Sequence, residues 1–199
     1  MRLWAPYERR LLVEYSSSQM PPNTIMNIGF SADGKTLAAR DYCGDIGLFD
    51  AQTLSILQHL PETLELFGPS TAFSPDSPYW ATPDYDHTVK VWDLRDGKLE
   101  LYQTLGDHTD SALCAAFSPN GILAVGCANG SVRLWDSSTW KERVTLKCHD
   151  KAVLAVCFSP DGSTLVTGSD DTTVRIHRAV SPEEVIEAER RGVDPLSVD

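Results

Sequence analysis

The sequence predicts an all-β fold built from repeated four-stranded antiparallel units, and three observations lead to this prediction. A Phe-Ser turn motif recurs at Phe30, Phe73, Phe117 and Phe158, at offsets of 43, 44 and 41 residues. A segment of alternating residues follows each copy, and its aromatic position comes 19, 19, 18 and 19 residues after the Phe. Short β-rich runs separated by turn residues connect these markers. Two markers that stay in register through four copies indicate structural repeats.

Each repeat is expected to contain four strands in the same order. The turn S-P-D-G at 159–162 has Ser, Pro and Gly where a type I turn favours them. The first and second strands flank this turn, and a second turn leads to the third strand. The expected first and second strands include 113–117, 122–127, 153–158 and 164–169. The expected third strands include 88–92 and 131–135, and 98–105 and 141–147 supply fourth strands with charged residues outward.

The two ends of the chain differ from the repeats. Residues 2–4 and 9–15 read as the last two strands of a preceding unit. After residue 178, Ser181 and Glu184 form a capping box, Pro182 suits the first helical position, and Gly192 can end the helix. We therefore expect an N-terminal strand and connector over 1–23, four repeats over 24–178, and a short helix with an acidic tail over 179–199.

Composition narrows the classes of partner. The formal net charge is -11, which disfavours nucleic acid and anionic membranes because both would be repelled. The sequence has neither an apolar run of membrane-spanning length nor a secretory signal. We expect no nucleic-acid partner, no membrane partner and a cytoplasmic location, with the nucleus left open. The five cysteines are expected to be reduced, mostly as small buried side chains.

The period, the four strands and the closing Trp-Asp pairs at 92–93 and 135–136 resemble the WD-repeat β-propeller family over about residues 24–178. The resemblance implies a β-propeller of about four four-stranded blades, followed by the short C-terminal helix. Family members usually have seven blades, so this array is expected to be an open or partial ring. An open arc is favoured, and a ring of two chains or a piece of a longer protein are the alternatives. Open blade edges would promote self-association.

The resemblance also implies structural roles for particular residues. Blades of this family often hold a hydrogen-bonded tetrad of His, Ser or Thr, Asp and Trp, and no copy here has all four. The matching residues are Thr82, Asp86 and Trp92 in the second repeat, His108 and Trp135 in the third, and His149, Thr167 and Asp171 in the fourth. The first repeat keeps almost none and is expected to be the least regular. Trp140 lies in a polar turn and is expected to contribute little to stability.

For function, the resemblance implies a non-catalytic scaffold that binds a protein or peptide on its loop face. The positions carried over as partner-binding residues are Met26, Tyr42, Phe67, Tyr85 and Asp170. An apolar segment flanked by Lys or Arg would suit aromatic anchors on an acidic molecule. Alternatively, these are loop residues that shield the tops of the blades and bind no partner.

The alternative is an enzyme on a propeller scaffold with an unrecognised site. The sequence has no G-x-S-x-G, phosphate loop, H-E-x-x-H or G-x-G-x-x-G motif. Cys148 and His149 are adjacent, but no second ligand pair follows at zinc spacing. We therefore expect no catalytic residues, no cofactor and no metal.

Overall fold

The computed structural model describes residues 2–5, 10–14, 25–41, 44–61, 70–106 and 110–178. These residues form antiparallel strands joined by turns, and no helix among them is long and apolar enough to cross a membrane. The strands are β1 Arg2–Ala5, β2 Arg10–Glu14, β3 Ile25–Phe30, β4 Thr36–Asp41, β5 Ile46–Asp50, β6 Ile56–Leu60, β7 Ala72–Phe73, β8 Tyr79–Pro83, β9 Val89–Arg95, β10 Lys98–Leu105, β11 Ala112–Phe117, β12 Ile122–Cys127, β13 Ser131–Asp136, β14 Lys141–Lys147, β15 Val153–Phe158, β16 Thr164–Ser169 and β17 Val174–Arg178.

The strands form one sheet for each repeat. The first blade has the order β3-β4-β5-β6, the second β7-β8-β9-β10, the third β11-β12-β13-β14 and the fourth β15-β16-β17. All neighbours within a sheet are antiparallel, and β1 pairs with β2 in a separate hairpin. The predicted all-β propeller architecture with about four blades is therefore confirmed.

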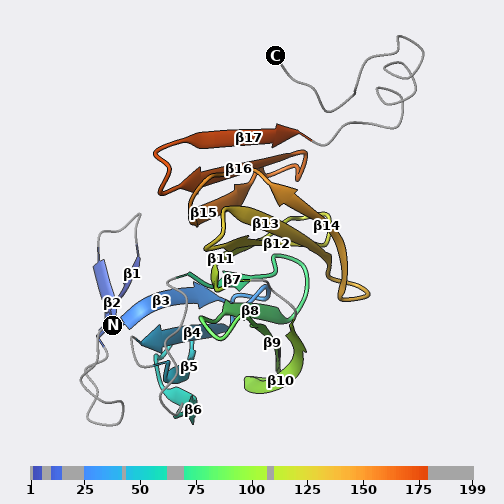
Figure 1. Ribbon diagram of the computed structural model, residues 1–199. Coiled ribbons are helices and arrows are strands. Elements are labelled where there is room, and N and C mark those ends of the chain that lie inside the picture. The colour runs from blue at the N-terminus through green and yellow to red at the C-terminus, as the bar shows by residue number, and fades with distance from the viewer. Residues whose placement is uncertain are drawn as a thin grey trace, which may run out of the picture.

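The blades stack in sequence order as an arc, with the first and fourth at opposite ends of the array (Figure 1). The first strand of each later blade packs against the blade before it: β7 contacts β3, β11 contacts β7 and β8, and β15 contacts β11 and β12. Each internal blade thus buries both faces of its sheet, as a half-buried four-stranded unit requires.

Three layers of the apolar core lie between consecutive blades, and a fourth cluster of Leu37, Ala39, Phe49 and Leu54 lies on the other face of the first blade. The layer between the first and second blades includes Leu48 and Trp80, and the layer between the third and fourth includes Cys114 and Val153. The layer between the second and third contains Trp135 and Trp140. Trp140 is only 6% exposed and packs in this layer, which argues against the expectation that it contributes little to stability.

A capped turn explains why Trp140 points inward. The Asp136 carboxylate accepts hydrogen bonds from the Ser138 and Thr139 amides at 2.9 and 3.2 Å. The Trp140 amide donates to the Asp136 carbonyl at 2.7 Å, and Trp140 has a φ of 54°. This left-handed residue closes the turn before β14, and its indole lies against the layer between blades.

The strands of the first blade are more regular than the sequence predicted. The first blade forms strands of five or six residues, whereas β7 of the second blade has only two. The first repeat is therefore not the least regular in strand pairing. Strands are found near both predicted N-terminal segments, as β1 and β2. The predicted helix after residue 181 lies outside the described residues.

Candidate functional site: the loop face of the blades

The loops at one end of the blades are hydrogen-bonded to each other across blade boundaries. The Ala112 amide, at the start of the third blade, donates to the Asp84 carbonyl in the second blade at 3.3 Å. The Ser111 hydroxyl donates to the Tyr85 carbonyl at 3.1 Å. These two bonds attach the loop between β8 and β9 to the loop that precedes β11.

The same arrangement continues into the fourth blade. The Ala128 amide donates to the Ser111 carbonyl at 2.9 Å, and the His149 amide donates to the Gly130 carbonyl at 3.0 Å. Gly130 has a φ of +83°, and a Cβ there would lie 2.0 Å from the His149 carbonyl oxygen. Only glycine fits this crossing. The loops of the second, third and fourth blades therefore form one continuous surface, here called the loop face.

The structure places three of the five predicted partner-binding residues. Tyr85 lies on the loop face and is 42% exposed. Asp170 is exposed in the equivalent loop of the fourth blade, where its amide donates to the Ala152 carbonyl at 3.0 Å. Met26 lies in β3 of the first blade and is 46% exposed. Tyr42 and Phe67 lie outside the described residues, so the structure does not place the predicted three-aromatic patch.

The loop face is acidic. Asp86, Asp150 and Asp170 are exposed on it. Among the described residues of these loops, Lys151 supplies an exposed positive charge. Charges of one sign on a surface that also exposes an aromatic ring favour a partner of the opposite charge.

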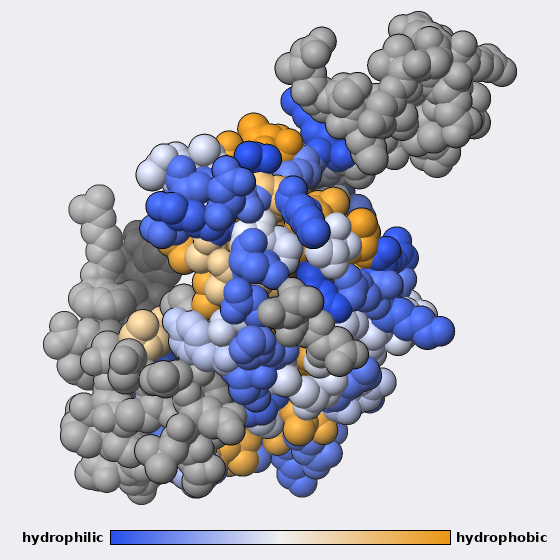
Figure 2. Space-filling view, viewed as in Figure 1, coloured by the Kyte–Doolittle hydropathy of each residue, from blue (hydrophilic) through white to orange (hydrophobic). Residues whose placement is uncertain are grey.

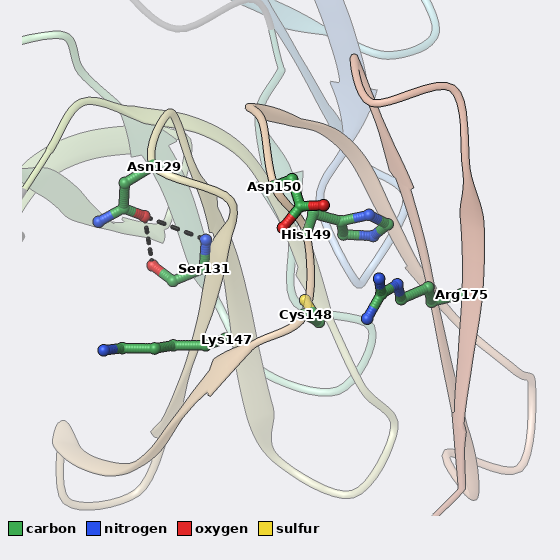
Figure 3. Close-up of a pocket in the computed structure, with 7 residues that line it drawn as sticks. All are labelled: Asn129, Ser131, Lys147, Cys148, His149, Asp150 and Arg175. Carbon is green, nitrogen blue, oxygen red and sulfur yellow. Dashed lines mark hydrogen bonds between the residues drawn. The ribbon is translucent and has the colours of Figure 1, made fainter.

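A pocket opens beside the loop face, between the third and fourth blades (Figure 3). Its volume is about 450 Å³, and its lining residues are Asn129, Ser131, Lys147, Cys148, His149, Asp150 and Arg175. Arg175 extends from β17 toward Cys148 and His149, whereas Lys147 extends away from Arg175 (Figure 3). The two cations therefore do not converge on one point.

His149 is held by neighbours on both ring nitrogens. Its Nδ1 lies 2.9 Å from the Asp171 carboxylate, and its Nε2 lies 2.8 Å from the Thr167 hydroxyl. That hydroxyl also lies 3.3 Å from Nε2 of His177, which stands where the second and third repeats have Trp. These contacts connect the loop before the blade to its second and third strands, a structural arrangement.

The adjacent thiol is poorly suited to chemistry. Cys148 is buried, and burial raises the pKa of its thiol above the ordinary value. The thiolate that metals and electrophiles require is therefore disfavoured. Among the described residues, no three His, Cys, Asp or Glu side chains are grouped to hold a metal ion.

The other repeats fill the tetrad positions differently. In the second blade, the Trp92 indole donates to the Thr82 hydroxyl at 2.9 Å. Asp86 accepts from the Thr88 amide and hydroxyl and so shapes its own turn. In the third blade, Val125 occupies the position of Thr82 and Trp135 is buried. His108 lies outside the described residues.

Sequence reasoning missed a buried ion pair beneath the loop face. Arg40 of the first blade donates to the Asp84 carboxylate of the second at 2.9 Å, and both side chains are almost fully buried. Lys90 lies 3.3 Å from the other Asp84 oxygen. Burial raises the pKa of Asp84, although the two cations act to lower it. The sequence feature that could have indicated a buried charge is Arg40 itself, because it ends the otherwise apolar segment 37–40.

The fold and the loop face define a repeat protein of the propeller class, and comparison with known proteins identifies the family. The family "WD domain, G-beta repeat" matches residues 70–93, 99–136 and 140–178. The chain belongs to the WD-repeat family.

Three relatives show the range of similar proteins. A chromatin assembly factor 1 subunit FAS2 homolog of Oryza sativa is 34% identical over 122 residues, 54% of this chain and 24% of that protein. A U3 small nucleolar RNA-associated protein 15 homolog of Xenopus laevis is 33% identical over 103 residues, 51% and 19% respectively. An uncharacterized WD repeat-containing protein of Synechocystis is 31% identical over 148 residues, 73% and 41%. The chain thus spans less than half the length of each.

Proposed function

We propose that this WD-repeat chain is a non-catalytic platform that binds a protein partner through its loop face and works within a larger assembly. The observation that carries the proposal is the continuous hydrogen-bonded loop face of three blades, which presents an exposed Tyr85 among carboxylates. A surface fixed by backbone bonds loses little conformational freedom when a partner binds, and this favours recognition.

The chemistry of the surface indicates the class of partner. Tyr85 supplies a large, rigid anchor, Asp86 follows it in the same loop, and Asp150 and Asp170 add negative charge on the loops of the fourth blade. A peptide segment with an apolar residue flanked by Lys or Arg would bury its apolar group on the ring and be steered by the rim. Met26, Tyr42 and Phe67 belong to the proposed site as sequence-based assignments.

Catalysis is not part of this proposal. Both ring nitrogens of His149 have partners, and the Cys148 thiol is buried with a raised pKa. The net charge of -11 supports a protein partner over direct contact with nucleic acid. A cytoplasmic location is proposed. The names of two relatives refer to chromatin assembly and small nucleolar RNA, and they support examining the nucleus as well.

Two loop-face variants test the proposal. Tyr85→Ala removes the anchor, and Asp170→Lys reverses the charge of an exposed side chain on the rim. The chain is used as bait in lysate of its source cells, and a partner protein captured by the wild type is quantified by mass spectrometry at low and high salt. Tyr85→Ala should lower recovery of that protein about tenfold or more, the loss expected for a binding hot spot. Asp170→Lys should lower recovery mainly at low salt, where the charge is least screened.

The matched control is Leu101→Ala, which removes an apolar side chain 52% exposed on the outer strand β10. It should leave recovery unchanged, and circular dichroism should show the same fold for all variants. Equal recovery with wild type and Tyr85→Ala would contradict the assignment of the loop face. Turnover of a substrate by the purified chain would contradict the platform itself.

A further inference from the structure

The fourth blade holds a histidine where the second and third blades hold tryptophan. In the register of the repeats, His177 of β17 corresponds to Trp92 and Trp135. The Trp92 indole donates to the Thr82 hydroxyl at 2.9 Å. Nε2 of His177 lies 3.3 Å from the hydroxyl of Thr167, which is the repeat equivalent of Thr82. His177 therefore places an N–H donor at the same position, but on a ring that can gain a charge near neutral pH.

The neighbours of His177 determine which of its nitrogens carries the proton when the ring is neutral. Nδ1 of His149 lies 2.9 Å from the Asp171 carboxylate, so in a neutral His149 ring Nδ1 donates and Nε2 accepts. The Thr167 hydroxyl lies 2.8 Å from that Nε2, so it donates to His149 and accepts from Nε2–H of His177. This chain of hydrogen bonds is complete with a neutral His177, and a second proton on Nδ1 of His177 adds a charge to it but no bond.

The cation nearest along β17 opposes that added charge. Arg175 lies two residues before His177, on the same side of the strand, and its repeat equivalent Arg133 lies 5.0 Å from the centre of the Trp135 ring. A guanidinium over a neutral indole is attracted to the ring, whereas a guanidinium beside an imidazolium is repelled. Arg133 is also paired with Glu142, while Arg175 forms no ion pair with any of the described residues.

The other described side chains around His177 supply no negative charge to it. β16, which pairs with β17, carries no titratable side chain. The His149 ring faces His177 across the Thr167 hydroxyl. The Cys148 thiol, beside Thr167, stays neutral because burial raises its pKa. Arg178 follows His177 and projects from the other side of the strand.

The nearby carboxylates offset the repulsion only weakly. Asp171 contacts Nδ1 of His149, the ring nitrogen that does not face Thr167. Asp150 and Asp170 are exposed, and Figure 2 shows hydrophilic surface at the end of the fourth blade where Figure 1 places the turn between β16 and β17. Water therefore screens these charges. Burial, followed by the His149 ring and the Arg175 guanidinium, lowers the pKa of His177 below its ordinary value.

We propose that the fourth blade is a pH-sensitive part of the chain, in which protonation of His177 loosens β16, β17 and the turn that carries Asp170. Above the ordinary histidine pKa of about 6.5, the ring is neutral in both the folded and the unfolded state. As the pH falls below that value, the unfolded segment takes up a proton that the folded site disfavours, so stability of the blade is lost. The second and third blades have tryptophan at this position and lack this source of pH dependence. The effect requires no partner on the loop face.

Hydrogen exchange tests the proposal on the full-length chain. Deuterium uptake is measured by mass spectrometry at about pH 7.5 and about pH 5.5, with exchange times adjusted for the intrinsic rate at each pH. Protection of the segment 164–178 should fall about threefold or more at the lower pH. The segment 122–136 of the third blade, which contains Trp135, should keep its protection and is the internal control.

Substitutions separate His177 from the other titratable groups. His177→Trp restores the residue of the second and third repeats, and His177→Gln keeps an N–H donor that cannot be charged. Either variant should abolish the loss of protection at the lower pH. Arg175→Gln should reduce the loss because it removes the repelling charge. Lys147→Gln should leave it unchanged, because Lys147 extends away from Arg175 (Figure 3).

Three results would overturn the proposal. The first is equal protection of 164–178 at both pH values in the wild type. The second is a loss that persists in both His177 variants, which would assign the pH dependence to the His149–Asp171 pair, or a loss that is undiminished in Arg175→Gln. The third is an NMR signal of the His177 ring, assigned by its absence from His177→Gln, that titrates at or above about pH 6.5.

Discussion

The boundary between the first and second blades and the boundary between the second and third both bury apolar side chains between consecutive sheets, but they differ in their polar and aromatic contacts. At the later boundary, the Trp140 ring meets Tyr79 edge-on at 5.1 Å. The earlier one also buries Trp80, but there Arg40 and Asp84 add a buried ion pair, and the Phe73 ring covers Gly29. The repeat therefore determines the spacing of the blades, while the side chains determine how each boundary responds to mutation and pH.

This difference has a physical consequence. Aromatic rings stabilise a boundary through buried area and edge-to-face contact, neither of which depends on protonation. A buried ion pair offsets its own desolvation only when both partners are present. We therefore expect the aromatic boundary to lose stability in proportion to the surface removed, and the charged boundary to depend on pH.

The largest effect is expected at the aromatic boundary. Trp140→Ala should lower the free energy of unfolding by about 4 kcal/mol, because it deletes a large side chain that is 6% exposed. Urea denaturation followed by circular dichroism measures this. Trp140→Gly is the matched control, since it loses the same ring but relieves the left-handed backbone at φ 54°. A loss below about 1 kcal/mol for the alanine variant would mean that the indole does not fill the boundary.

The next effect is expected at the charged boundary. Arg40→Leu should cost about 3 kcal/mol at pH 7, because it leaves the Asp84 carboxylate buried beside Lys90 alone. Burial already raises the pKa of Asp84, and loss of Arg40 should raise it further. A carboxyl whose pKa is higher in the folded state destabilises the fold increasingly as the pH rises above its unfolded value. The defect should therefore be smaller near pH 4 than at pH 7.

The double variant Arg40→Leu/Asp84→Leu provides the control for that prediction. It removes both charges and should recover much of the stability lost in the single variant. A defect that is equal at both pH values, or equal in the single and double variants, would show that the ion pair is not what Arg40 contributes.

The sequence predicted the parts of the fold that local pattern determines. The strands expected at 122–127, 141–147, 153–158 and 164–169 match β12, β14, β15 and β16 residue for residue, because alternation and turn residues are local signals. The polar tetrad residues could also be located from the repeat register, and Thr82 does bond Trp92.

The features that sequence reasoning missed depend on distant residues. Arg40 and Asp84 are 44 positions apart, and nothing near either one announces the partner. Trp140 follows two Ser and a Thr, so its neighbours suggest a solvent-exposed turn. Only the left-handed backbone at Trp140 directs the ring between blades, and that conformation is uncommon for a bulky residue. The partner-binding residues remain a prediction for a related reason, since a partner's chemistry is not part of this chain.

The smallest effect concerns a polar contact at the outer edge of the first boundary. Gln58 in β6 accepts from the Leu99 amide at 2.8 Å and donates to the Leu99 carbonyl at 3.3 Å. Because Gln58 is only half-buried and water can replace part of the lost contact, Gln58→Ala should cost only about 1 kcal/mol. Gln58→Glu keeps the acceptor of the shorter bond and loses the donor of the longer one, so it should retain about half of that stability at neutral pH. If Gln58→Ala cost as much as Arg40→Leu, the outer strands would hold these blades together more strongly than the buried ion pair, and the contrast between the two boundaries would have to be redrawn.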